Sequence, residues 1–392
     1  MAEIIFERTD GNLGRLPASE DATSGLLIYD LDTTETRIVT TNVKDAETQL
    51  GPTLWEKYKQ FVIDFFAIQP SATLYIDVYE PTVFPTFTEI IDLQRFAEGK
   101  IRQLGIVLIG DVSYQMFLTD IVVTDTHITA MQTQADVLRA EHMPLQIIYA
   151  GHTNSFATLS SFPDCRTFSS SDVSVCIVAP QKVITGDSLT NVSFLPRVGI
   201  ALGAVAYSQV HENIGWVANI NIANLEGMNS PQIAINSLTT SVSSLSDMDL
   251  KNLTDKGYIF AKKYIGLSGS FLNDAPTCTA LTSDFAYIEN NRTLDKAIRQ
   301  TRILLLPSLN SPVLLNPDGT LTAKDISRFS VLSRKALEQM QRDGEVSNFY
   351  VFIDPNQNVL STSEIEIEMS VQPVGVARKL NVKIGFAANL IS

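Results

Sequence analysis

The segments Leu74-Tyr-Ile-Asp-Val-Tyr79, Thr88-Glu-Ile-Ile-Asp-Leu-Gln-Arg-Phe-Ala-Glu98 and Leu104-Gly-Ile-Val-Leu-Ile109 follow one another closely and determine the fold class. The first and the third are short and nearly all apolar, which predicts two buried strands. In the second, apolar residues recur at helical spacing, and Gly99 follows as a stop signal. A strand, a helix and a strand in this order indicate a parallel sheet covered by helices.

The same alternation continues on both sides of this stretch. We predict further strands over 26–29, 145–149 and 173–178, and helices over 52–68, 127–140 and 196–210. Pro52 suits the first turn of its helix, and the spacing of Gly199 and Gly203 is typical of a helix that packs tightly on a sheet. The sequence therefore predicts an α/β domain over residues 22–255, with a mostly parallel sheet covered on both faces.

The last third of the chain has a different pattern and predicts a smaller α+β domain over residues 256–375. Its expected elements are a small strand pair within 256–271, helices over 292–306 and 322–342, and strands over 364–371 and 379–386. The last two strands alternate strictly, with glutamates on the polar side of the first and lysines on the polar side of the second. This pattern predicts an antiparallel hairpin in which glutamate and lysine side chains face each other.

Residues 1–21 and 376–392 are predicted to be extended arms outside both domains. A terminal segment is loose unless something ties it down, and each arm carries large apolar side chains in a strand-like run. These candidate strand-exchange residues are Ile4, Ile5, Phe6, Leu380, Val382, Ile384 and Phe386. Such a strand, when exposed on a monomer, invites pairing with another chain. The alternative is an ordinary sheet within one chain.

Composition limits the function classes. The 392 residues include 43 Asp and Glu against 29 Lys and Arg, a formal net charge of −14. This balance argues against a broad electrostatic contact with nucleic acid or with an anionic membrane. No apolar run approaches the roughly 18 residues of a membrane span, and the first residues lack the pattern of a signal peptide. Charged residues make up only 18% of the chain, which fits a protein buried in an assembly.

Catalytic and metal-binding motifs are missing from the sequence. It contains no P-loop, GxGxxG, GxSxG, HExxH or EF-hand pattern. Its four histidines lack the spacing of metal ligands, and its three cysteines form no CxxC pair. The carboxylates are scattered, and no two of them stand out as an acid–base pair. We therefore expect no enzyme activity, no cofactor and no metal.

Positive charge is concentrated near the C-terminus. Residues 292–392 carry 12 Lys and Arg against 10 Asp and Glu, so the excess of negative charge lies before residue 292. On a helical wheel at about 100° per residue, four cations of the helix over 322–342 fall within about 40° of one another. They are Lys324, Arg328, Lys335 and Arg342, and we call them the basic ridge. The ridge is either a solvated helix face or a docking strip for an acidic partner.

Eight short segments stand out by their order along the chain. They are Asp10-Gly-Asn-Leu-Gly-Arg-Leu-Pro17, Ser24-Gly-Leu-Leu27, Val210-His-Glu-Asn-Ile-Gly-Trp216, Asn291-Arg-Thr-Leu-Asp-Lys-Ala-Ile298, Leu309-Asn-Ser-Pro-Val313, Ala336-Leu-Glu-Gln-Met340, Ile353-Asp-Pro-Asn-Gln-Asn-Val359 and Pro373-Val-Gly-Val-Ala-Arg-Lys379. Together they resemble the family of contractile phage tail sheath proteins. The resemblance is firm near both ends of the chain and loose over residues 30–200.

The resemblance implies a structural subunit that polymerises, as stacked hexameric rings, into a six-fold helical sleeve around an inner tube. Residues 22–255 would face outward and residues 256–375 would face the tube, so the basic ridge would meet the tube. The arms would exchange strands between subunits, with hinges near Ala22 and Gly375. The sleeve would shorten and drive the tube through a target cell envelope.

Partners and location follow from the same resemblance. The expected partners are further copies of the chain, a tail tube protein, and baseplate and tail terminator proteins, with no direct contact to nucleic acid and no membrane insertion. The expected location is the tail sheath of a virion, assembled in the cytoplasm of the host bacterium. The sheath of a bacterial phage-tail-like contractile injection system is an alternative. An enzyme or a receptor-binding tail module is a remote one.

Overall fold

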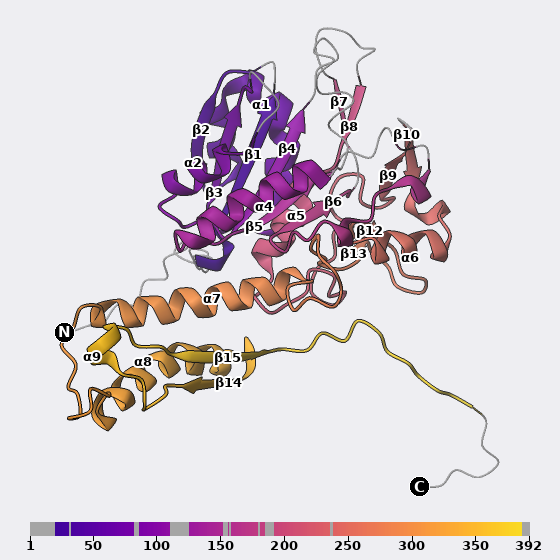
Figure 1. Ribbon diagram of the computed structural model, residues 1–392. Helices are drawn as coiled ribbons and strands as arrows, with labels where there is room; N and C mark the ends of the chain where they lie inside the picture. Colours follow the sequence, from indigo (N-terminus) through magenta and orange to yellow (C-terminus); the bar gives the residue numbers. More distant parts are fainter. Residues whose placement is uncertain are drawn as a thin grey trace, which may run out of the picture. The chain divides into compact units, whose positions relative to one another are not determined.

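The structure, a computed structural model, divides into two compact units. We call residues 1–312 the large unit and residues 313–392 the small unit (Figure 1). The residues that the structure describes are 20–30, 33–81, 86–109, 125–151, 156, 158–178, 181–184, 192–235 and 238–385.

A mostly parallel sheet forms the centre of the large unit, as the sequence predicts. Among the described residues it has seven strands. In order across the sheet they are β11 (Tyr258–Ile259), β6 (Val173–Cys176), β5 (Gln146–Ala150), β4 (Gln103–Ile109), β1 (Ser24–Asp30), β3 (Leu74–Tyr79) and β2 (Thr36–Thr40). All neighbouring strands run parallel except β2, which is antiparallel to β3. The predicted strands are confirmed, and β2 and β11 are additions.

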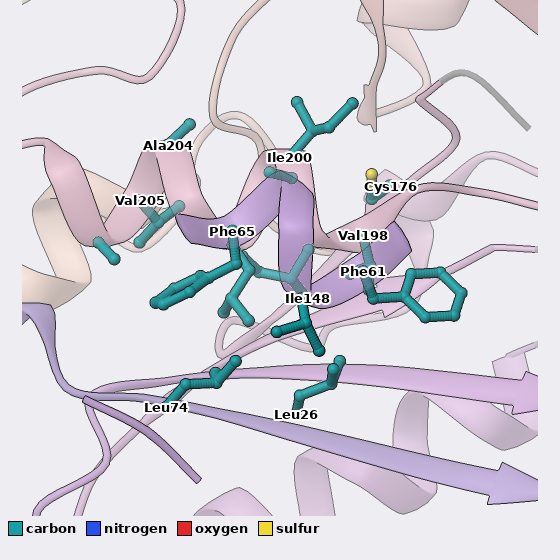
Figure 2. Close-up of a cluster of buried hydrophobic side chains, with 14 of the residues drawn as sticks. Leu26, Phe61, Phe65, Leu74, Ile148, Cys176, Val198, Ile200, Ala204 and Val205 are labelled. Carbon is teal, nitrogen blue, oxygen red and sulfur yellow. The ribbon is translucent and has the colours of Figure 1, made fainter. Parts of the chain in front are cut away.

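Helices cover both faces of this sheet. They are α1 (Val43–Ile68), α2 (Glu89–Phe96), α4 (Asp125–Ala140) and α5 (Val198–Tyr207). Leu26 and Ile28 of β1 belong to the apolar cluster with α1 and α5, whereas Leu27 and Tyr29 belong to the cluster with α2 and α4. Because side chains alternate along a strand, this division places the two helix pairs on opposite faces. Figure 2 shows the first cluster, with α1 and α5 crossing above Leu26.

The helix α1 begins earlier than the sequence predicts. It starts after Asn42, whose side chain accepts a hydrogen bond from the Asp45 N–H. At Gly51 the backbone leaves helical geometry with φ of 71°, and Pro52 then begins a second helical segment. The prediction found the second segment, because a glycine and a proline in sequence are typical of a helix boundary.

The glycine pair of α5 packs against another helix, which corrects our prediction that it packs on the sheet. A Cβ placed on Gly199 would lie 2.1 Å from the carbonyl oxygen of Phe61 in α1. One on Gly203 would lie 3.0 Å from the carbonyl oxygen of Phe65. The glycines therefore let two backbones meet. Val198 and Leu202 of α5 face the sheet, since the side chains of both lie next to Gly105 of β4.

Smaller elements complete the large unit. The antiparallel pairs are β7 (Gln181–Ile184) with β8 (Val192–Leu195), β9 (Gln232–Ile235) with β10 (Leu238–Ser241), and β12 (Ala261–Lys262) with β13 (Phe271–Leu272). The remaining helices of the described residues are η1 (Glu20–Ala22), η2 (Leu159–Ser161), η3 (Cys165–Thr167), η4 (Val242–Ser244), α6 (Asp247–Asp255), α7 (Ile288–Leu305) and η5 (Leu306–Ser308). The pair β12–β13 confirms the strand pair predicted within 256–271. The sheet also continues past residue 255, because β11 belongs to it.

The small unit packs one long helix on a two-stranded ribbon and has a second, short helix. Its elements are α8 (Ala323–Arg342), β14 (Val346–Phe352), α9 (Val359–Thr362) and β15 (Glu368–Pro373). Phe329, Leu337 and Met340 of α8 are buried. The strands β14 and β15 pair antiparallel, with Tyr350 opposite Ser370.

The hairpin predicted between residues 364–371 and 379–386 is wrong. In the structure β15 pairs with β14, a strand that the sequence analysis missed, and the described residues after Pro373 form no strand. Of the first predicted strand, residues 368–371 lie in β15. Its partner could not be chosen from the sequence, because the pattern specifies which face is apolar and says nothing of which strand lies alongside.

Candidate assembly surfaces

The root of the N-terminal arm is fixed to α7 by charge. The Asp21 carboxylate lies 2.8 Å from the Lys296 amino group and 2.8 Å from the Arg299 guanidinium. The Asp21 carbonyl oxygen accepts hydrogen bonds from Gln103 and Arg292. Burial alone would raise the pKa of Asp21, but the charges of Lys296, Arg299 and Arg292 lower it below the ordinary value. The carboxylate is therefore held in its charged form.

Ala22, near which a hinge is predicted, lies in the part of the arm that packs on the large unit. Ala22 is buried, and the Arg102 N–H donates to the Thr23 carbonyl oxygen at 2.9 Å. Cations at 292, 296 and 299 recur at helical spacing, a signal that the sequence contains. Asp21, their partner, lies far away in the sequence, so the cluster was missed.

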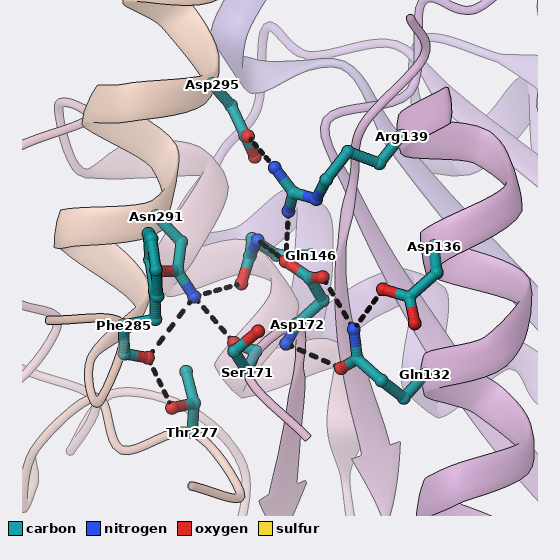
Figure 3. Close-up of polar contacts among 10 residues, drawn as sticks. All are labelled: Gln132, Asp136, Arg139, Gln146, Ser171, Asp172, Thr277, Phe285, Asn291 and Asp295. Atoms are coloured by element: carbon teal, nitrogen blue, oxygen red, sulfur yellow. Dashed lines mark hydrogen bonds and ion pairs between the residues drawn. The ribbon is translucent and has the colours of Figure 1, made fainter. Parts of the chain in front are cut away.

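A second polar cluster ties the same helix to the sheet. The Arg139 guanidinium of α4 pairs with Asp172 and, at 2.8 Å, with Asp295 of α7 (Figure 3). Gln146 of β5 donates to Asp172, and Asn291 of α7 donates to the Ser171 carbonyl oxygen. Burial raises the pKa of Asp295. Burial also works against the charge of Arg139, yet its two carboxylates raise its pKa. The cluster is a structural connection, since it joins α4 and α7 to β5 and to the loop before β6.

The basic ridge lies on α8, away from the face that packs on the ribbon. Lys324, Lys335 and Arg342 are exposed, and among the described residues they form no ion pair. Arg328 is half-buried and pairs with Asp325 at 3.2 Å. Val331, which is 60% exposed, lies on the same side of the helix as the ridge. The ridge is thus a solvent-facing strip with three cations available to a partner.

The ribbon of β14 and β15 is open on both sides. Within the described part of the chain each strand pairs only with the other, so each keeps one edge of unpaired backbone groups. Tyr350 and Phe352 stack on its outer face with ring centroids 6.4 Å apart, and both are exposed. Open edges beside exposed aromatic rings are typical of a surface that another strand covers.

The C-terminal arm is extended and exposed through its described part. Leu380 is 80% exposed, Val382 83% and Ile384 95%. Folded proteins rarely leave several large apolar side chains in a row in water. The other candidate residues of the arms, Ile4, Ile5, Phe6 and Phe386, lie outside the described residues.

In the described part of the chain, no three His, Cys, Asp or Glu residues gather in a way that could hold a metal ion. Cys165, Cys176 and Cys278 are buried and free, and burial raises the pKa of Cys176 to about 12. A thiol with so high a pKa is a poor nucleophile at neutral pH. Among the described helices, none has the length and apolar character to cross a membrane.

Comparison with known proteins places this chain in a family. The N-terminal domain of DUF2586 matches residues 1–276, and its C-terminal domain matches residues 284–391. The chain belongs to the DUF2586 family. Among proteins of curated function, no sequence matches it.

Solved structures share its fold over nearly the whole length. A chain from the helical sheath of the anti-feeding prophage (AFP) in its contracted state is 13% identical, with a TM-score of 0.56 and 99% of both chains covered. A chain of the contracted PVC sheath complex, from an extracellular contractile injection system, is 11% identical, with a TM-score of 0.58 and coverage of 99% of this chain and 98% of that one. The sheath tail protein Lin1278 from Listeria innocua is 11% identical, with a TM-score of 0.55 and coverage of 92% and 94%. The predicted resemblance to sheath proteins is confirmed at the level of the fold.

Proposed function

We propose that this protein is the subunit of a contractile sheath, which polymerises as a six-fold helical sleeve around an inner tube and shortens to drive that tube through a cell envelope. The observation that carries the proposal is the match to the AFP helical sheath, which covers 99% of both chains. A match of this extent includes both units, whereas a shared α/β domain alone would be weak support for a function.

The arms would join subunits by strand exchange. The residues 380, 382 and 384 place apolar side chains on one side of an extended segment. Among the described residues, no further strand pairs with either edge of the ribbon β14–β15. A strand from another subunit, added to such an edge, would gain backbone hydrogen bonds and cover Tyr350 and Phe352. Ile4, Ile5, Phe6 and Phe386 would act in the same way from the two chain ends.

The basic ridge would contact the tube. Its exposed cations suit an acidic partner, and residues 256–375 are proposed to form the part of the sheath that faces inward. Exposed ion pairs contribute only about 0–1 kcal/mol each. A contact of this strength would hold the sleeve in register and would still separate when the sleeve widens.

The proposed partners are other copies of the chain, a tube protein, a baseplate and a terminator protein. The assembly would be either the tail of a phage, made in the bacterial cytoplasm, or a phage-tail-like contractile injection system. The likeness to the PVC sheath favours the second, because that sheath belongs to an extracellular contractile injection system. Protection of DNA in purified particles from nuclease would identify a phage tail, and DNA-free particles that end in a baseplate would identify an injection system.

The test of the proposal is electron microscopy of the purified chain, alone and with its tube protein. We expect hollow tubes of regular diameter. Deletion of residues 376–392 should leave a folded monomer, with an unchanged circular dichroism spectrum, that forms no tubes. Failure of the wild-type chain to polymerise under any of these conditions would refute the proposal.

A matched pair of variants tests the strand exchange itself. Leu380, Val382 and Ile384 changed together to serine should abolish tubes, because the apolar side of the strand is lost. Lys379, Asn381 and Lys383 changed together to serine alter the opposite side of the same segment and should leave tubes intact. Equal effects of the two triple variants would contradict strand exchange in the proposed register.

A further inference from the structure

The root of the N-terminal arm, residues 20–23, is held mainly by polar contacts. Four contacts act on Asp21 and Thr23. The side chain of Asp21 pairs with Lys296 and Arg299, its carbonyl oxygen accepts from Gln103 at 3.1 Å, and the Thr23 carbonyl oxygen accepts from Arg102. The helix η1 itself buries only one apolar side chain, that of Ala22. Apolar packing of η1 alone would hold this segment weakly.

Positive charges outnumber negative charges around Asp21. One carboxylate, Asp21, faces Lys296, Arg299 and Arg292, and the buried guanidinium of Arg102 lies near enough for its pKa to respond to Asp21. The side chains of Asp21 and Lys296 are each 15% exposed. Pairs so shielded are weakened little by salt. Asp295 and Glu20 also act on Arg299 and Arg102. Loss of the Asp21 carboxylate would nevertheless leave more positive than negative charge here, which would push the segment off α7.

The helix α7 is itself fixed. Asp295, the residue next to Lys296, pairs with Arg139 of α4, and Asn291 contacts the loop before β6. A pull on the chain before residue 20 would reach Asp21 before it reaches β1, which begins at Ser24, so the contacts with α7 would share the load with the central sheet. In the sequence, α7 also leads directly toward the small unit, which carries the C-terminal arm.

We propose that the contacts of Asp21 with Lys296 and Arg299 form a permanent anchor, which carries tension from the N-terminal arm into α7 and stays closed while the sheath shortens. This inference rests on the proposed sheath function and goes beyond it, because it names where load enters the subunit and which contact does not open. An ordered root also lowers the entropy cost of donating the arm to a neighbour.

A zero-length carbodiimide cross-link tests whether the anchor stays closed. The reagent activates a carboxylate and joins it to an amine in direct contact, and the Asp21–Lys296 pair at 2.8 Å meets this condition. Mass spectrometry should find this amide in monomers, in extended sheaths and in contracted sheaths, in similar yield. Lys296→Arg keeps the charge and should remove the cross-link. Loss of the cross-link in contracted sheaths alone would overturn the proposal.

A second experiment tests whether the anchor matters for assembly. Asp21→Asn should keep the circular dichroism spectrum of the subunit, speed hydrogen exchange at the Arg102 amide, and raise the subunit concentration needed for tube formation about tenfold. Glu98→Gln is the matched control, because it breaks an ion pair with Lys100 on the exposed surface. The control should assemble like the wild type.

The outcomes separate this inference from the proposed function. If wild-type tubes form and Asp21→Asn tubes form at the same concentration with the same resistance to urea, the anchor carries no load and the inference fails. If the wild type forms no tubes, the proposed function fails first. Slower assembly of Asp21→Asn with unchanged exchange at Arg102 would also overturn the inference, because the defect would then lie elsewhere.

Discussion

Replacing Gly199 by alanine should destabilise the large unit, although alanine is the better helix former. On an open helix face this change would gain about 1 kcal/mol. Here the new Cβ would stand 2.1 Å from the Phe61 carbonyl oxygen and 2.9 Å from its carbonyl carbon. Contacts this short do not occur, so α1 and α5 would have to separate by roughly 1 Å.

The size of the effect follows from what would have to move. Both helices are packed on the central sheet, and the obstructing atoms are backbone, which cannot rotate away as a side chain can. Overpacking of a core costs about 1–3 kcal/mol when side chains can adjust and occasionally more. We expect a net loss of about 3 kcal/mol or more for Gly199→Ala. Gly203→Ala, whose Cβ would meet backbone at 3.0 Å, should lose clearly less.

Urea unfolding of the unassembled subunit, followed by tryptophan fluorescence, measures the difference. Both tryptophans lie in the large unit, and Trp55 is buried in α1 close to the crossing. The comparison of Gly199→Ala with Gly203→Ala serves as the control, because both substitutions change the same helix in the same way. If Gly199→Ala proves as stable as the wild type, the two backbones do not meet as described.

Three further predictions concern charge and reactivity. Reversal of Lys324, Arg328, Lys335 and Arg342 to glutamate should weaken co-assembly with the tube protein, most of all at low salt. The control Arg334→Glu removes a cation that lies off the ridge and pairs with Glu338, so it should change co-assembly little. Sedimentation of both variants with the tube measures co-assembly, and equal effects would count against the docking strip. Arg197→Met should cost about 3–5 kcal/mol in urea unfolding at pH 8, because it leaves the buried Asp64 carboxylate unpaired. Burial already raises the pKa of Asp64, so the variant should regain stability as the pH falls toward 5 and this group takes up a proton, and a constant loss across that range would contradict the assignment. The three buried cysteines should not react with an aromatic disulfide reagent at pH 8 until the subunit is unfolded, and prompt release of the chromophore would show that one of them is accessible.

The sequence predicted the large unit well, because both faces of its sheet are covered. Strands such as β3 and β4 are nearly all apolar for that reason, and the helix α2 between them carries its apolar residues at helical spacing. The edge strand β2 was missed, since Thr36-Arg-Ile-Val-Thr40 is half exposed and has little apolar pattern. A buried strand or helix has a recognisable apolar pattern in the sequence, whereas an exposed edge strand has almost none.

The candidate surfaces also differ in whether the sequence could predict them. The basic ridge was found from helical spacing alone, because all its members lie on one helix. The Asp21 anchor was not found, since its partners come from distant parts of the chain. The pairing of β15 was assigned to the wrong strand for a related reason. The alternation in Glu366 to Val371 was visible, but β14 has aromatic residues at 349, 350 and 352 on both sides and shows no alternation.

The arrangement of residues 379–385 affects how the subunit behaves before it meets a partner. Free subunits in solution would expose the apolar side chains of Leu380, Val382 and Ile384, and such exposure favours amyloid-like stacking of identical segments. Lys379 and Lys383 lie in the same segment, so stacked copies in register would bring equal charges together at every layer, which is unfavourable. The same lysines would cause no such repulsion beside an acidic or neutral strand. The two lysines thus disfavour aggregation of free subunits without hindering strand exchange in the sheath.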